Sequence, residues 1–193
     1  GSEVQEAVDQ LLTLRIVGLD IETTGLDPKH DQILLIQLGT ADHVYVFDFK
    51  QIGSAAECLR EVISNLDIIK LGQNLSFEWI FLEENGLPLR GMLLDTMIAG
   101  KLLNLGLKVK NGLGDLVARH LGWEMEEKKE LQLSFVGHEG SFSSDQLDYA
   151  ARDVSVCFPL WNVLKKKLKK EELSYIFKLE CRALPAFASM KHN

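Results

Sequence analysis

The alternation of apolar and polar residues predicts an N-terminal helix followed by several strands. Residues 3–13 have the spacing of a short helix, and residues 15–22 form an apolar run, typical of a buried strand, that ends in a Thr-Thr-Gly turn. Residues 32–39 and 43–48 are also strand-like, and a short polar link separates them. Such a link predicts that these two strands pair as an antiparallel hairpin.

The middle of the chain alternates between predicted helices and strands. We expect helices over residues 54–64, 74–85 and 95–103, and short strands over 67–72 and 91–94. Ser54 and Glu57 have the spacing of a capping box at the start of the first of these helices. A hairpin followed by βαβ units predicts an α/β domain, a mixed sheet flanked by helices, over residues 1–193.

The last third of the chain contains a loop-rich segment and then one long helix. We expect a short helix that ends near Gly122 and a polar, irregular connection over residues 124–140, placed near a substrate. The long helix begins at Ser143, which forms a capping box with Gln146. Pro159 interrupts its amphipathic pattern and predicts a kink.

Composition narrows the functional classes. The net charge of −7 argues against a basic surface that binds nucleic acid without specificity, but it permits a nuclease whose acids bind divalent metals. Cys58, Cys157 and Cys181 lack metal-ligand spacing and suit a reducing, intracellular compartment. We expect no membrane span and no secretory signal. Gly1 and Ser2 resemble a scar left by tag cleavage.

Asp20 and Glu22 are the most informative residues of the first strand. Residues two apart on a strand point to the same side, so both carboxylates face one way. Two like charges held together on a buried strand are costly unless a cation, commonly a divalent metal, joins them. For an isolated Asp-x-Glu, a strand end whose acids reach solvent is the better interpretation.

Two further segments carry polar residues that need an explanation. Tyr149 and Asp153 lie four residues apart on the long helix and therefore share a face beside its apolar stripe. At a strand-to-helix junction, Asn74 has the position of a helix cap and Glu78 that of a first-turn acid favoured by the helix dipole. Each segment alone is compatible with a purely structural role.

Together, the three segments resemble the DEDD superfamily of 3′–5′ exonucleases, which has a ribonuclease-H-like fold. The shared order is Asp20-x-Glu22 on a strand, Gly72-Gln73-Asn74 with an acid at position 78, and Tyr149-x-x-x-Asp153 on a late helix. This order is similar to the tyrosine-bearing subclass. The segments Leu94–Met97 and Asp145–Asp153 further resemble proofreading domains of family A DNA polymerases and ribonuclease D-type enzymes. Residues 176–193 resemble the start of a linker into a polymerase domain.

The resemblance implies a mechanism with two divalent metal ions, Mg²⁺ or Mn²⁺. It assigns the metal ligands, the residue that orients the attacking water, and residues near the substrate strand. The metal ligands would be Asp20, Glu22, Glu78 and Asp153, the water would be oriented by Tyr149, and the substrate contacts would be Thr23, Leu26, Gln73 and Asn74. Glu78 departs from the family, which has Asp there, and its additional methylene predicts weaker binding of the second metal.

Three functions stay open at this point. The resemblance favours a proofreading exonuclease that acts on single-stranded or frayed DNA 3′ ends, with a polymerase domain as its C-terminal partner. A ribonuclease D-like RNA 3′ exonuclease is the second interpretation, and the two differ in whether they accept a 2′-hydroxyl. The third is a structural or nucleic-acid-binding domain without activity, which the unusual Glu78 would favour.

Overall fold

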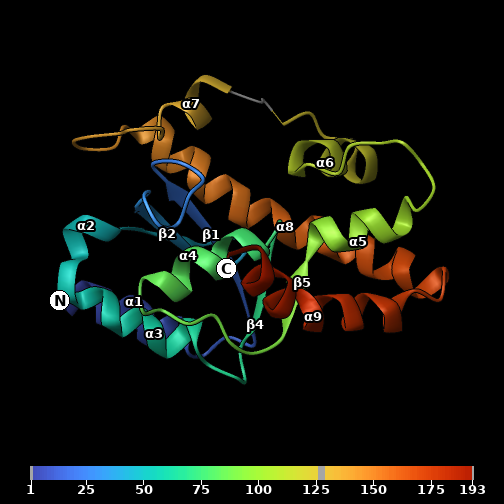
Figure 1. The fold of residues 1–193 in the computed structure, drawn as a ribbon, viewed down its shortest axis with the longest axis horizontal. Helices are drawn as coiled ribbons and strands as arrows, with labels where there is room; N and C mark the ends of the chain where they lie inside the picture. Colours follow the sequence, from blue (N-terminus) through green and yellow to red (C-terminus); the bar gives the residue numbers. More distant parts are fainter. Residues whose placement is uncertain (1, 126–128, 193) are drawn as a thin grey trace.

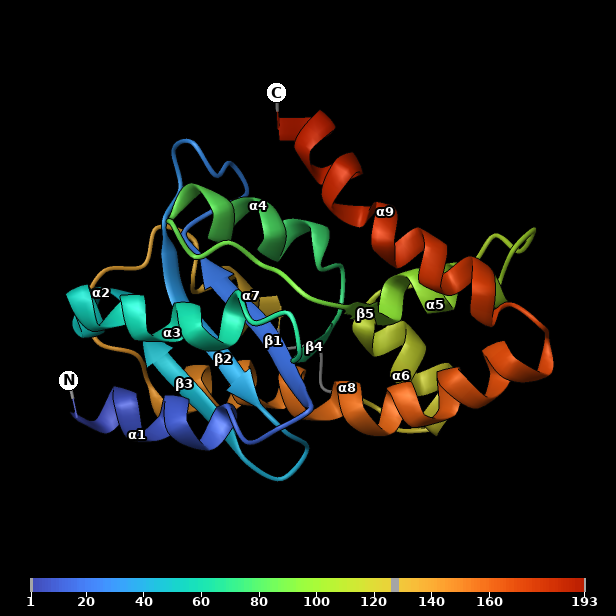
Figure 2. The ribbon, with the colours of Figure 1, turned by 90° about the horizontal axis from the view of Figure 1, so that it is seen from below.

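The strands form one mixed sheet in the computed structural model (Figure 1), which describes residues 2–125 and 129–192. Their order across the sheet is β3-β2-β1-β4-β5 (Figure 2). The strands are β1 Ile16–Thr23, β2 Ile33–Gly39, β3 Val44–Asp48, β4 Ile69–Gly72 and β5 Leu93–Asp95. β1, β2 and β3 are antiparallel neighbours, whereas β4 runs parallel to both β1 and β5. The predicted hairpin and mixed sheet are therefore confirmed.

The predicted elements appear in the predicted order, but helices over residues 49–52, 129–133 and 174–192 were not predicted. Helices surround this sheet. They are α1 Ser2–Leu11, α2 Phe49–Ile52, the 3-10 helix η1 Gly53–Ala55, α3 Ala56–Ile63, α4 Ser76–Glu84, α5 Thr96–Leu103, α6 Leu113–Leu121, α7 Lys129–Leu133, α8 Ser144–Lys170 and α9 Ser174–His192. In the described part of the chain, no helix is long and apolar enough to cross a membrane.

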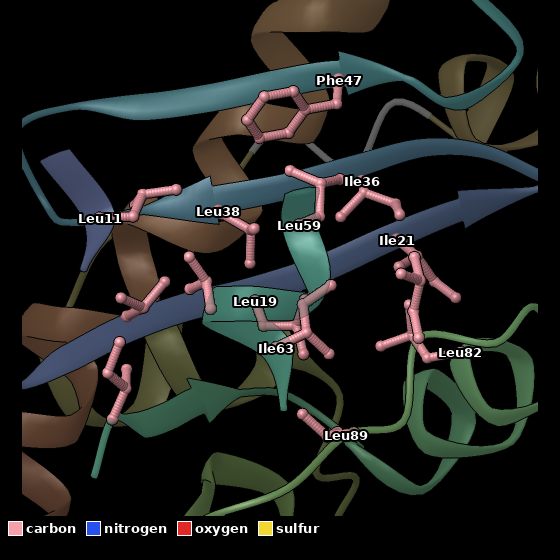
Figure 3. Packing of buried hydrophobic residues seen from close by; sticks show 14 of the residues in the cluster. Leu11, Leu19, Ile21, Ile36, Leu38, Phe47, Leu59, Ile63, Leu82 and Leu89 are labelled. Carbon is pink, nitrogen blue, oxygen red and sulfur yellow. The ribbon is translucent and has the colours of Figure 1, made fainter. Parts of the chain in front are cut away.

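The two faces of the sheet are covered by different helices. Leu19 and Ile21 of β1 belong to a buried cluster that also includes residues of α1, α3 and α4 (Figure 3). α8 packs across the other face, and α9 folds back from its end to lie along α5 and α4 (Figure 2). Phe177 and Leu184 are among the side chains that α9 buries. The long helix α8 therefore spans the sheet face on which chemistry-bearing side chains of β1 can meet it.

The capping box predicted at Ser54 and Glu57 is wrong. The chain turns helical directly after β3, where the Asp48 side chain caps α2 by accepting a hydrogen bond from the Gln51 N–H at 2.9 Å. Ser54 then lies inside η1, and α3 begins after Ala55 without a side-chain cap. A cap formed six residues earlier thus replaces the predicted one.

Two expectations for the C-terminal third need qualification. The connection 124–140 is not wholly irregular, because it contains α7; residues 126–128 lie outside the described residues. α8 continues past Pro159 to Lys170, and the kink expected there stays a prediction.

Candidate active site

β1 presents Asp20 and Glu22 on the sheet face that α8 covers. Gly18 faces Val154 and Phe158 of α8. Because side chains along a strand point alternately to the two faces, Asp20 and Glu22 lie on the same face as Gly18. The predicted same-side placement of the two carboxylates is therefore confirmed. The parallel pairing of β1 with β4 ends at Gly18, so the sheet leaves room beside Asp20 and Glu22 for side chains from other elements.

α8 brings Tyr149 and Asp153 to the same place. The helix start is fixed by the predicted capping box, in which the Ser143 hydroxyl accepts from the Gln146 N–H at 3.2 Å and the Gln146 side chain accepts from the Ser143 N–H at 3.0 Å. α8 can approach β1 closely because Gly18 has no side chain. A Cβ atom there would lie 2.6 Å from Val154 Cγ1.

α4 supplies Glu78, whose side chain is only 3% exposed. The helix is not capped by Asn74, so that prediction is wrong. Asn74 has a left-handed backbone (φ 60°) and uses its side-chain oxygen to accept from the Ser76 hydroxyl. The Asp95 carboxylate instead accepts from the Asn74 N–H at 3.1 Å and the Leu75 N–H at 2.8 Å.

These elements enclose a cavity of about 510 Å³. Its walls contain all the predicted catalytic residues and most of the predicted substrate contacts. They are Asp20, Glu22, Thr23, Leu26, Asn74, Glu78, Tyr149 and Asp153. Leu26 is 84% exposed at the mouth. Leu133, Phe135 and Val136 complete the wall, so part of the connection 124–140 does lie at the site, although its individual wall residues carry no motif by which the sequence could have identified them.

Gln73 is the predicted site residue that does not line this cavity. Its amide nitrogen donates to the Asn111 carbonyl oxygen at 2.9 Å, and its amide oxygen accepts from the Thr96 hydroxyl. Both polar ends of the side chain are therefore engaged in joining β4 to α5 and to the loop before α6. The geometry assigns Gln73 a structural role behind the site.

Burial and mutual repulsion raise the pKa values of the clustered carboxyl groups. Burial, followed by the charge of Asp153, raises the pKa of Asp20 to about 8. Burial and the charges of Asp20 and Asp153 raise the pKa of Glu22 to about 9. The pKa of Glu78 is also raised, chiefly by burial and then by Asp20, with which it shares a hydrogen bond. A cluster with these pKa values holds protons unless a cation replaces them.

Tyr149 and Arg152 surround Asp153 on α8. Burial and the neighbouring carboxylates raise the pKa of Tyr149, so its hydroxyl keeps its proton and acts as a hydrogen-bond donor. Arg152 Nη2 lies 3.2 Å from Asp153 Oδ1, and its guanidinium carbon lies 5.0 Å from the centre of the Tyr149 ring. Sequence reasoning missed Arg152, because an arginine beside a motif acid carries no spacing signal.

The donor set fits hard divalent cations. It consists of carboxylate oxygens, and Glu78 Oε2 is buried with no hydrogen-bond partner in the described chain. Among the described residues, no group of three or more acidic, histidine or cysteine side chains already stands in coordinating positions. Asp20 instead bonds Glu78, and Asp153 bonds Arg152. To coordinate a metal ion, Asp20 and Asp153 would have to exchange these hydrogen-bond partners for the ion. Such an exchange needs new side-chain rotamers but no change of fold.

A family model described as "3′–5′ exonuclease" matches residues 1–169. The chain belongs to the 3′–5′ exonuclease family. The exonuclease chain is 33% identical over 167 residues to DNA polymerase I of Aquifex aeolicus and 28% identical over 171 residues to ribonuclease D of Haemophilus influenzae. These matches cover 86% and 88% of the chain, but only 26% and 41% of those relatives. The chain thus spans less than half the length of either curated relative.

A solved structure shares the fold of this exonuclease family member. Brucella melitensis NrnC with bound Mg²⁺ superimposes with a TM-score of 0.80 at 22% identity, covering 92% of this chain and 85% of that one. The predicted fold class, a ribonuclease-H-like mixed sheet flanked by helices, is confirmed.

Proposed function

We propose that the protein is a metal-dependent 3′–5′ exonuclease that removes nucleoside monophosphates from the 3′ ends of DNA. The observation that carries this proposal is the convergence of Asp20, Glu22, Glu78 and Asp153, from three separate elements, on one cavity beside Tyr149. Family membership supports the reaction, and the Mg²⁺ in the related NrnC structure supports the metal class. Buried carboxyl groups gathered at one cavity have no evident structural purpose.

Asp20, Glu22 and Asp153 would hold one divalent ion, and Asp20 with Glu78 would hold a second. When bound, these ions supply an activated water and neutralise charge on the scissile phosphate and the leaving oxygen. The Tyr149 hydroxyl would donate a hydrogen bond that orients the attacking water. Because the pKa of Tyr149 is raised in the metal-free site, its hydroxyl would serve as a donor rather than as a general base near neutral pH.

The exposed Leu26 would pack against the terminal base at the cavity mouth. The Thr23 hydroxyl donates to the Gly25 carbonyl and fixes the turn before Leu26. From the resemblance to the DEDD superfamily, the Thr23 backbone would meet the 3′-hydroxyl. Asn74, held in its left-handed conformation beside Glu78, would contact the strand. Residues 133–136 would close the opposite wall.

The second candidate function is an RNA 3′ exonuclease that uses the same site, and the similarity to ribonuclease D supports it. The similarity to DNA polymerase I favours DNA, and it also motivates a polymerase domain as the C-terminal partner. Degradation of 3′-labelled DNA and RNA oligonucleotides of one sequence, with Mg²⁺ and then with Mn²⁺, separates the candidates. Faster release of deoxynucleotides supports the proposal, preference for RNA supports the second candidate, and no metal-dependent release from either contradicts both.

A further inference from the structure

Arg152 contacts two of the proposed active-site residues at once. Its Nε and Nη2 atoms lie 3.3 Å and 3.2 Å from Asp153 Oδ1, and its guanidinium lies over the Tyr149 ring at 5.0 Å. The side chains of Arg152 and Asp153 are 34% and 17% exposed. The ion pair is therefore partly shielded from water at the edge of the cavity.

This geometry is more specific than a surface ion pair. A guanidinium is planar, and its fork of N–H groups can grip one carboxylate while its face rests on an aromatic ring. Two N–H groups that converge on Asp153 Oδ1 occupy the lone pairs of that oxygen. A divalent ion bound through the same oxygen would have to displace them.

The charges of the site also suggest an electrostatic role for Arg152. In the described chain, the Arg152 guanidinium is the positive side chain that forms an ion pair with the proposed ligands Asp20, Glu22, Glu78 or Asp153. It offsets part of the repulsion between these carboxylates. A bound divalent ion would offset that repulsion more strongly, and would itself be repelled by a cation fixed so close by.

We propose that Arg152 is a positioning residue that holds Asp153 as an internal counter-cation and releases it when a divalent ion binds. The proposal rests on the proposed function, since it takes Asp153 to be a metal ligand. It predicts that ion binding and the Arg152–Asp153 contact are mutually exclusive. Arg152 thereby raises the concentration of metal at which the site fills.

Calorimetric titration of the full chain with Mg²⁺, without nucleic acid, tests this exchange. At pH 8.5, where competition from protons is reduced, we expect Arg152→Gln to bind Mg²⁺ about three- to tenfold more tightly than the wild type, as expected for loss of one charged hydrogen-bonded contact. Arg152→Lys should fall between the two, because an ammonium lacks the fork.

Lys166→Gln is the matched control for loss of a positive charge. Lys166 is exposed on the same helix, about 21 Å along its axis from Arg152, which is beyond the screening length at physiological salt. We expect its Mg²⁺ affinity to equal that of the wild type.

Thermal unfolding gives a second readout that does not depend on activity. Without metal, Arg152→Gln should unfold at a lower temperature than the wild type, because Asp153 loses its partner. In saturating Mg²⁺ the difference should shrink, since the contact with Asp153 is already broken in the wild type. A purely structural arginine would give the same difference in both conditions.

The outcomes separate this inference from the proposed function. If the wild type binds Mg²⁺ and Asp153→Asn abolishes binding, but Arg152→Gln binds no more tightly than the wild type, the exchange is wrong and the metal site stands. If the wild type binds no Mg²⁺, or Asp153→Asn leaves its affinity unchanged, the proposed metal site is wrong and the exchange fails with it.

Discussion

The Asp95 carboxylate at the end of β5 accepts a hydrogen bond from the Leu75 N–H at 2.8 Å, across two different strand-to-helix junctions. The same carboxylate caps its own helix, α5, by accepting from the Met97 N–H at 2.8 Å. Asp95 is 2% exposed. One buried side chain thus fixes the helix that carries Glu78 relative to the sheet that carries Asp20.

Asp95→Asn should therefore impair both stability and cleavage. The amide keeps one acceptor oxygen and introduces a donor facing backbone N–H groups, which should lower the free energy of unfolding by about 1–3 kcal/mol. Denaturant unfolding measures this loss, and initial cleavage rates should fall with it because Glu78 shifts. Asp48→Asn, the same change at the cap of the short α2, should cost less and leave cleavage unaltered. Equal effects of the two variants on stability and cleavage would contradict the role of Asp95 in positioning α4.

Gly18→Ala should push α8 away from β1. A Cβ atom at this position lies 2.6 Å from Val154 Cγ1 and 2.9 Å from Phe158 Cε2, and such overpacking costs about 1–3 kcal/mol. We expect a lower melting temperature and slower cleavage, because α8 carries Tyr149 and Asp153. Gly112→Ala, where the nearest atom is the movable Asp115 Oδ2 at 3.0 Å, is the control: it should lower the melting temperature less and leave cleavage unchanged.

The stability of the metal-free protein should fall as pH rises from about 4 to 9. The pKa values of Asp20 and Glu22 are about 8 and 9 in the folded protein, above those of the unfolded chain. The folded state thus binds more protons over this range, and its advantage is lost as pH rises through the folded pKa values. Melting temperatures at pH 6 and pH 9 in a chelator should differ by several degrees. Saturating Mg²⁺ should reduce the difference, whereas an equal loss with metal would argue against coordination by these groups.

Glu78→Asp should lower the concentration of metal needed for cleavage. The shorter side chain restores the Asp that the resemblance to the DEDD superfamily implies at this position, and retracts the carboxylate by ~1.5 Å, a large distance for a metal ligand. Titrations of Mg²⁺ and Mn²⁺ against activity measure the change, with the exposed Glu61→Asp as the control. An unaltered metal requirement would show that Glu78 does not serve the second ion.

The sequence predicts most of the elements because their signals are local, although α2, α7 and α9 were not predicted. The hairpin follows from the short link between two strand-like runs, and the start of α8 follows from the Ser143–Gln146 capping box, which the structure confirms. The placement of Asp20 and Glu22 on one face follows from the two-residue period of a strand. At Asn74, by contrast, a cap was predicted from residue type alone, while the structure uses Asp95, which is distant in sequence.

The parts of the site that escaped prediction depend on contacts between distant segments. The position of Gln73 behind the cavity is set by Thr96 and Asn111. The wall formed by residues 133–136 depends on contacts with α8, where the Gln146 amide donates to the Ser134 hydroxyl. Neither arrangement has a spacing signal, because each is decided by tertiary packing.

Release of nucleotides from a 5′-labelled single-stranded DNA tests the central claim most directly. With Mg²⁺ or Mn²⁺, the wild type should shorten the strand from its 3′ end one nucleotide at a time, and a chelator should stop the reaction. Asp20→Ala should slow this release by more than ~100-fold while the protein stays folded. Cleavage by Asp20→Ala at the rate of the wild type would contradict the proposed metal site.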